Sequence, residues 1–244
     1  MRAARPKGHG WKGDSEKTIS ASRFNNTLST LRSIFELGIH RGIILVNPAA
    51  SLARVSPKAK PMRIPGREDF QRIVGEIRNA GGAVSQCCAD LVEFLAYSGC
   101  RIDESRWVKW SDVDRERKQI WIGGHVVTGT KSGKGRWVPI TSAMAQLVDD
   151  LEANPRYPKS KDRKSNGYVL AVRECQKAIN RACTKLNVER FTHHDMRHLF
   201  CTACLESGVD FATLAKVAGA FGRWELVSEN LLTSKDRAQP SDGG

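Results

Sequence analysis

Two basic side chains at the start of one predicted helix have the types and the spacing to hold a phosphate. Residues 191–200 read FTHHDMRHLF, and Thr192 with Asp195 has the form of a capping pair at a helix N-terminus. His194 and Arg197 are three residues apart, so both project from the same side of the first turn. A helix N-terminus favours anions, and a guanidinium group can donate two hydrogen bonds to one phosphate. A helix cap with scattered surface charge explains this segment, taken alone, equally well.

A second arginine and a basic turn precede this helix in the chain. Arg101 follows a helix break at Gly99 and has Glu104 one turn later. Such a pair forms on many protein surfaces; alternatively, Glu104 orients an arginine that points into a pocket. Lys131 and Lys134 lie at the tip of a predicted β-hairpin. A basic hairpin is usually solvated or in nonspecific contact with phosphate, but one that folds over a polyanion can supply a proton to a leaving oxygen.

Together these residues predict the transfer of a phosphoryl group without a metal ion. Two arginines and a histidine around one phosphate would neutralise the charge that builds on its nonbridging oxygens. The sequence shows no acidic cluster of the kind that binds a metal, so we expect neither a metal nor a cofactor. Cys201 and Cys204 form a CxxC pair within a predicted helix. Without a second pair at metal spacing, core packing is favoured over a zinc or redox site.

The net charge favours a polyanionic partner. The chain has 244 residues and a formal net charge of +13, which indicates nucleic acid or an anionic membrane surface. The membrane is the weaker alternative, because no apolar run is long enough to span a bilayer and no apolar signal core begins the chain. RNA is disfavoured because the short strands carry no aromatic stacking motif. Seven cysteines, most within apolar helical patterns, predict reduced core residues and the bacterial cytoplasm.

The apolar periodicity around these residues predicts the elements that would position them. It indicates a mainly α fold with a small antiparallel sheet, in the α+β class. Helices are expected at residues 15–37, 67–80, 83–97, 100–108, 142–153, 173–186, 211–217 and 224–232 and from residue 193 onward. Short strands are expected at 119–122, 125–130 and 136–140, and an apolar connection at 38–47. Apolar residues at helical spacing are expected in the core: Phe70, Ile73, Val74, Ile77, Cys87, Leu91, Phe94, Leu95, Met196, Leu199, Phe200 and Ala203.

A proline-rich, basic stretch at residues 55–65 predicts a linker between two domains. We therefore expect residues 1–59 to form a basic arm and a partial helical domain, and residues 60–244 to form the main domain.

Three stretches together resemble the tyrosine recombinases of the phage-integrase type. SGCRIDE at residues 98–104 is similar to the first box of that family, and HDMRHLF at 194–200 to the second. TKSGKGRWVPI at 130–140 looks like its β-hairpin segment. The resemblance spans about residues 66–232, and the helix before Asn47-Pro48 resembles the end of the family's core-binding domain. It implies a tyrosine-recombinase catalytic domain, DNA integration at double-stranded attachment sites of a phage or other mobile element, and a homo-oligomer, a tetramer on DNA.

The resemblance also implies roles for individual residues. Arg101 and Arg197 would hold the scissile phosphate. Lys131 would be the general acid on the leaving 5′ oxygen, and His194 would assist proton transfer. The remaining positions would support the site or contact DNA: Glu104 and His198 beside the site, Lys134 and Arg136 on the DNA.

The nucleophile that the family uses is absent from its expected position. In the family, a tyrosine follows a Gly-His or Gly-Trp pair by about nine residues. Gly219 matches the glycine here, but the tyrosine slot falls on Glu229 or Asn230, and neither side chain can form a phosphotyrosyl bond. Three interpretations stay open: a broken integrase copy, a tyrosine supplied by another subunit, or a non-catalytic DNA-binding or regulatory relative. The tyrosines of the chain all precede the second box: Tyr97, Tyr157 and Tyr168.

Overall fold

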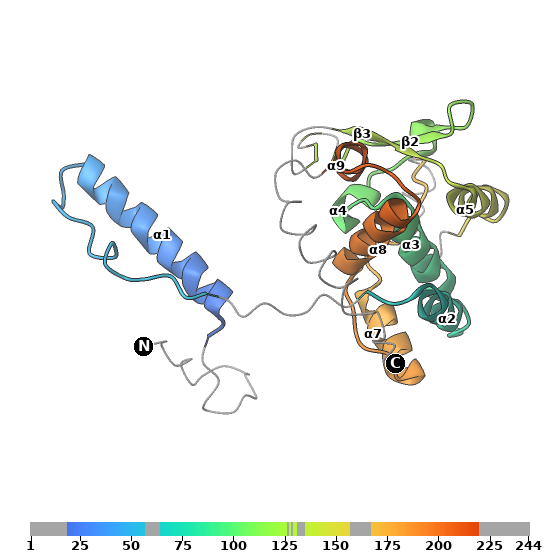
Figure 1. Cartoon of the computed structure of the whole chain (residues 1–244), viewed down its shortest axis with the longest axis horizontal. Helices are drawn as coiled ribbons and strands as arrows, with labels where there is room; N and C mark the ends of the chain where they lie inside the picture. Colours follow the sequence, from blue (N-terminus) through green and yellow to red (C-terminus); the bar gives the residue numbers. More distant parts are fainter. Residues whose placement is uncertain are drawn as a thin grey trace, which may run out of the picture. The chain divides into compact units, whose positions relative to one another are not determined.

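The computed structural model describes residues 19–56, 64–125, 127, 129–130, 135–156 and 167–219. The chain divides into two compact units, Met1–Met62 and Arg63–Gly244 (Figure 1). The expected helix at 224–232 lies outside the described residues. The assignment of the first unit to a partial core-binding domain stays a prediction.

The first unit is built on one long helix, α1 (Ala21–His40). Ser20 fixes its start, because the serine hydroxyl accepts a hydrogen bond from the Arg23 N–H at 3.2 Å. The predicted start lies outside the described residues, and the predicted end near Leu37 is wrong. The helix continues up to a turn at Gly42, which has a φ of 70°. The first residues of the connection expected at 38–47 are therefore helical.

Side chain–backbone hydrogen bonds hold the following segment against α1. The Arg32 guanidinium donates to the carbonyl groups of Ala49 at 3.0 Å, Ala50 at 3.1 Å and Leu52 at 2.6 Å. The predicted turn at Asn47 is present, since its side-chain oxygen accepts a hydrogen bond from the Ala49 N–H at 3.0 Å. The path of the chain after α1 thus depends on polar groups of the helix.

The second unit is organised around α3 (Ser85–Ser98), in which ten residues are buried. This helix packs against α2 (Arg67–Arg78), α5 (Ser142–Ala153) and α8 (His193–Glu206), and Figure 1 shows it behind α8. The other helical elements are α4 (Ile102–Ser105), η1 (Trp110–Asp112), α7 (Gln176–Leu186) and α9 (Phe211–Ala218). Among the described residues, no helix combines the length and the apolar character needed to cross a bilayer.

The expected core is confirmed with two exceptions on α8. Met196 and Phe200 are buried, whereas Leu199 is only partly buried and Ala203 is exposed. The buried face of α8 is rotated from its apolar pattern toward Arg197 and Cys201, both of which are buried. The other expected core residues are all buried: Phe70, Ile73, Val74, Ile77, Cys87, Leu91, Phe94 and Leu95.

The sheet is three-stranded and antiparallel, in the order β1-β2-β3, but one expected strand is wrong. Its strands are β1 (Val113–Asp114), β2 (Gln119–Ile122) and β3 (Arg136–Pro139). The segment expected as a strand at 125–130 contains, in its described part, a single bridge between His125 and Gly129. Gly124 and Gly129 have φ values of 71° and 66°, which turn the chain. Strand β1 was not predicted, because a strand of two residues shows no alternation of apolar and polar side chains. The mainly α fold with a small antiparallel sheet is confirmed.

The turn that joins α3 to α4 depends on a glycine at one position. Gly99 has a left-handed φ of 60°, and a Cβ added to it would lie 2.3 Å from Cδ1 of Phe200 in α8. The close approach of α8 to this turn therefore excludes a larger residue. The same contact places the middle of α8 next to the turn that precedes α4.

Replacing Gly99 by alanine should lower the free energy of unfolding by about 2–4 kcal/mol, through left-handed strain and overlap with Phe200. Chemical denaturation measures this loss. Gly75→Ala is the matched control, because Gly75 lies within α2 and its new Cβ would meet nothing within 4 Å. That substitution should raise the free energy of unfolding by about 0.5–1 kcal/mol. Equal effects of the two substitutions would contradict the packing described for Gly99.

Candidate active site

A buried carboxylate fixes Arg101 at the start of α4. Glu104, whose side chain is 3% exposed, accepts a hydrogen bond from the Arg101 N–H at 3.0 Å and another from Arg101 Nη1 at 2.9 Å. The carboxylate therefore orients both the backbone and the guanidinium of Arg101. The Arg101 side chain is 30% exposed, so part of its guanidinium faces solvent. This geometry favours the predicted orienting function of Glu104 over a simple surface pair.

Arg136 of β3 binds the same carboxylate from the other side. Its Nη2 donates to Glu104 Oε2 at 2.8 Å, and its Nε donates to the carbonyl of Val217 in α9 at 2.7 Å. The Arg136 side chain is only 8% exposed. The sequence-based expectation that Arg136 contacts DNA stays a prediction. Alternation along β3 places Arg136 on the same buried face as Val138, a signal that could have revealed this position.

The charges of two arginines control the ionisation of Glu104. Burial alone would raise its pKa, but hydrogen bonds and charge from Arg136, together with the hydrogen bonds from Arg101, outweigh burial. The pKa of Glu104 is lowered below its ordinary value as a result, and the group is ionised at neutral pH. One negative charge thus sits between two guanidinium groups.

Arg197 of α8 completes the cluster. The residue is 4% exposed, and its Nη1 donates to the carbonyl of Gly99 at 3.0 Å. Burial, followed by the positive charges of Arg101 and Arg136, lowers the pKa of Arg197 to about 10. Arg197 stays protonated at neutral pH, but the shift shows that positive charge is crowded here. Three arginines and one carboxylate leave this cluster with excess positive charge.

Two buried nitrogen atoms of the cluster have no hydrogen-bond partner among the described residues, Nη2 of Arg197 and Nη1 of Arg136. Buried donors are costly to leave unpaired. An anion with several acceptor oxygens could pair with such donors and offset the excess positive charge. The arrangement is therefore chemically suited to a phosphate group.

His194 and His198 lie one turn apart on α8 beside this cluster. Their rings meet edge to face, with centroids 5.2 Å apart. Burial is the main cause that lowers the pKa of His194, and the positive charge of Arg197 lowers it further. Burial is also the main cause that lowers the pKa of His198, followed by the charge of His194. Both imidazoles are therefore mainly neutral at pH 7 and can accept a proton. The predicted cap is present, because the Thr192 N–H donates to Asp195 Oδ2 at 2.7 Å.

Of the site residues predicted from the sequence, the structure brings together Arg101, Glu104, Arg136, His194, Arg197 and His198. The other site residues predicted from the sequence lie outside the described residues: Lys131, Lys134, Glu229 and Asn230. Within the described part of the chain, no group of His, Cys, Asp or Glu could hold a metal ion. Cys201 is buried, with a pKa raised to about 12 by burial, and packs in a small cluster that includes residues of α9.

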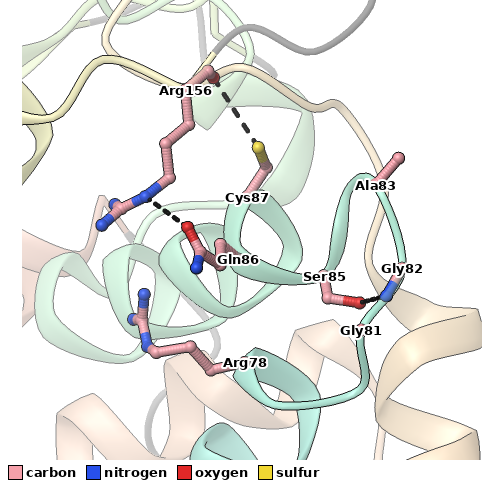
Figure 2. A pocket seen from close by; sticks show the side chains of 8 residues that line it. All are labelled: Arg78, Gly81, Gly82, Ala83, Ser85, Gln86, Cys87 and Arg156. Carbon is pink, nitrogen blue, oxygen red and sulfur yellow. Dashed lines mark hydrogen bonds between the residues drawn. The ribbon is translucent and has the colours of Figure 1, made fainter.

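Figure 2 shows the residues that line a cavity of about 480 Å³. They include Ser85 and Gln86 at the start of α3, whereas the arginine cluster lies beyond the other end of that helix. At 1.5 Å per residue the length of α3 separates the two by about 20 Å. Arg78 and Arg156 line the cavity, but both bind Asp90, at 2.7 and 3.1 Å. Their charges are already neutralised, so the arginine cluster around Glu104 is the better candidate for anion chemistry.

Comparison with known proteins gives consistent matches. The model of the phage integrase family matches residues 67–220. Tyrosine recombinase XerC of Alcanivorax borkumensis is 28% identical over 246 residues, which cover 95% of this chain and 74% of that protein. Tyrosine recombinase XerC of Listeria innocua is 22% identical over 213 residues, with coverage of 84% and 69%.

Solved structures show the same fold. The Tn1549 transposon integrase in complex with a circular intermediate DNA has a TM-score of 0.67 at 20% identity, covering 90% of this chain and 80% of that chain. A lambda integrase dimer bound to a COC' core site has a TM-score of 0.63 at 16% identity, covering 83% and 73%.

Glu104→Gln should lower the free energy of unfolding at pH 7 by about 3 kcal/mol, because two arginines lose their shared negative charge. The folded-state pKa of Glu104 lies below its unfolded value. Its ionisation therefore stabilises the fold above about pH 4.3, and this contribution is lost as the pH falls through the folded pKa. Urea unfolding of wild type and variant between pH 7 and pH 3 should show their difference shrinking as the pH falls.

Glu116→Gln serves as the control, because Glu116 is exposed in the turn between β1 and β2. Its substitution should change stability little at any pH. A difference between wild type and Glu104→Gln that stays constant with pH would show that the charge of Glu104 is not what stabilises the cluster.

Proposed function

The chain belongs to the phage integrase family, the tyrosine recombinases, and we propose that it binds double-stranded DNA and holds one phosphate of the duplex in the arginine cluster. The observation that carries this proposal is the pair of buried, unpartnered guanidinium nitrogens of Arg197 and Arg136 beside a single carboxylate. A phosphodiester supplies both the acceptor oxygens and the negative charge that this cluster lacks. The net charge of +13 supports the same partner.

In the proposed chemistry the cluster stabilises charge on the phosphate while a nucleophile attacks phosphorus. Arg101 and Arg197 neutralise the nonbridging oxygens. Neutral His194 accepts the proton of the attacking hydroxyl, and Lys131 supplies a proton to the 5′ oxygen as its bond to phosphorus breaks. Glu104 positions Arg101 without touching the DNA, and Arg136 holds Glu104 through Nη2 while its unpartnered Nη1 is offered to the phosphate.

The source of the nucleophile is the distinctive part of the proposal. All tyrosines of the chain precede the second box, so the chain has no tyrosine in the slot its family uses. We propose that a tyrosine-bearing chain of the same family completes the site within an oligomer on DNA, which in the family is a tetramer. The solved structure of a lambda integrase dimer on a core site supports assembly of this kind. The alternative, a DNA-binding or regulatory remnant of an integrase, is favoured by the same missing tyrosine.

The relatives support a proposed biological context. We propose a bacterial chain, encoded by a phage or another mobile element, that acts in the cytoplasm in DNA integration. The bacterial sources of the XerC relatives and the transposon integrase neighbour support this context. Residues 1–59 are proposed to be a basic arm and part of a core-binding domain, and residues 60–244 the catalytic domain.

Restoring a tyrosine should give the chain a cleavage activity of its own. Glu229→Tyr or Asn230→Tyr, whichever is in register, should form a covalent protein–DNA adduct on a nicked duplex, whereas the wild type should form none alone. The duplex would be selected from a random pool by binding to the wild type, and the adduct would be detected on a denaturing gel. Arg197→Ala in the same background should lower adduct formation by about 100-fold or more.

A mixing experiment tests whether the tyrosine can come from another chain. Wild type supplies the arginines, and a double variant with Arg197→Ala and the active tyrosine substitution supplies only the nucleophile. The mixture should label the double variant on DNA although neither protein does so alone. If the wild type binds the duplex but neither tyrosine variant forms an adduct, the non-catalytic alternative is correct.

A further inference from the structure

A group of aromatic and basic side chains lies next to α4. We call it the aromatic–cationic surface and define it as Trp107, Lys109, His125, Tyr168 and Arg173. Two backbone hydrogen bonds assemble it, from Trp110 N to Gly167 O at 2.9 Å and from Val169 N to Val108 O at 3.0 Å. They place Lys109 directly opposite Tyr168. Chain segments far apart in the sequence thus meet at one surface.

The rings of this surface pack by their edges, and the cations lie over their faces. Trp107 meets His125 with centroids 4.4 Å apart and Tyr168 with centroids 6.2 Å apart, both edge to face. Lys109 Nζ lies 5.6 Å from the centroid of Tyr168, and Arg173 Cζ lies 5.6 Å from that of Trp107. Each cation is therefore held in place by an aromatic face.

Neither cation is neutralised by a carboxylate of the described residues. The neighbouring carboxylates accept hydrogen bonds from backbone N–H groups instead. Asp112 accepts one from the Lys109 N–H at 2.8 Å, and Glu174 accepts one from the Gln176 N–H at 2.7 Å. Other arginines of the same unit differ, since Arg115 binds both Asp149 and Glu152. An aromatic face orients a cation without cancelling its charge, so Lys109 and Arg173 present full positive charge in defined positions.

We propose that Lys109 and Arg173 bind phosphates of the same DNA duplex that enters the arginine cluster. This inference rests on the proposed function and adds binding residues to it. Lys109 and Arg173 lie over the faces of Tyr168 and Trp107 on which a nucleobase would stack. The surface therefore suits phosphate oxygens better than bases. Arg106 steadies Arg173 further, because its Nε donates to the Arg173 carbonyl at 3.0 Å.

The position of the surface fits a shared duplex. Trp107 follows the end of α4, and Arg101 stands at the start of that helix. At 1.5 Å per residue, the four residues of α4 that lie between them span about 6 Å. Phosphates on one strand advance about 3.4 Å per nucleotide along the duplex axis. The surface therefore lies within reach of phosphates a few nucleotides from the one held by the cluster.

The salt dependence of duplex binding tests the proposal. For a 30-base-pair duplex of arbitrary sequence, the slope of log K against log salt should become less steep by about 0.9 for Lys109→Gln, by about 0.9 for Arg173→Gln and by about 1.8 for the double variant. Lys109→Arg should keep the wild-type slope. The matched control is Arg115→Gln, which removes the same formal charge from an arginine already neutralised by two carboxylates, and it should leave the slope unchanged.

The outcomes separate the two proposals. If the wild type does not bind duplex DNA, the proposed function fails. If the wild type binds with a steep slope that the correctly folded double variant retains, this inference alone is overturned. A double variant with an unchanged duplex slope but weaker binding to single-stranded DNA would show that the surface stacks bases instead. Circular dichroism and thermal unfolding establish that each variant is folded.

Discussion

One buried carboxylate, that of Glu104, holds the candidate active site together. It binds Arg101 from its own helix and Arg136 from a strand 32 residues away, while Arg197 approaches through the carbonyl of Gly99. A buried ion pair is stable only when its geometry compensates for the loss of hydration. Here the compensation is incomplete, because among the described residues one negative charge faces three positive ones. The fold thus builds a cluster whose excess positive charge suits an anion.

Most of the fold was predictable because its helices repeat apolar residues at helical spacing. The core residues of α2, Phe70, Ile73, Val74 and Ile77, follow directly from that period and are buried. The sheet was less predictable for two physical reasons. β1 is too short to show alternation, and the β-branched segment after β2 is turned by glycines with positive φ, whose conformations a composition-based argument does not detect.

The candidate site was predictable where its contacts are local. Arg101 with Glu104, and His194 with Arg197, are spaced one helical turn apart, so the sequence itself places their side chains together. Arg136 was identified as basic, but its partner comes from another element, which no local spacing reveals. The same limit applies to Lys109 and Arg173, whose positions depend on rings contributed by other segments.

The hydrogen bond from Arg136 to the Val217 carbonyl, near the end of α9, makes two parts of the molecule thermodynamically dependent on each other. The Arg136 guanidinium joins this carbonyl to the carboxylate that orients Arg101. A ligand that favours one arrangement of Arg101 therefore also favours one position of the end of α9. By reciprocity, a contact that fixes that end of the helix in the favoured position strengthens ligand binding at Arg101 by the same factor.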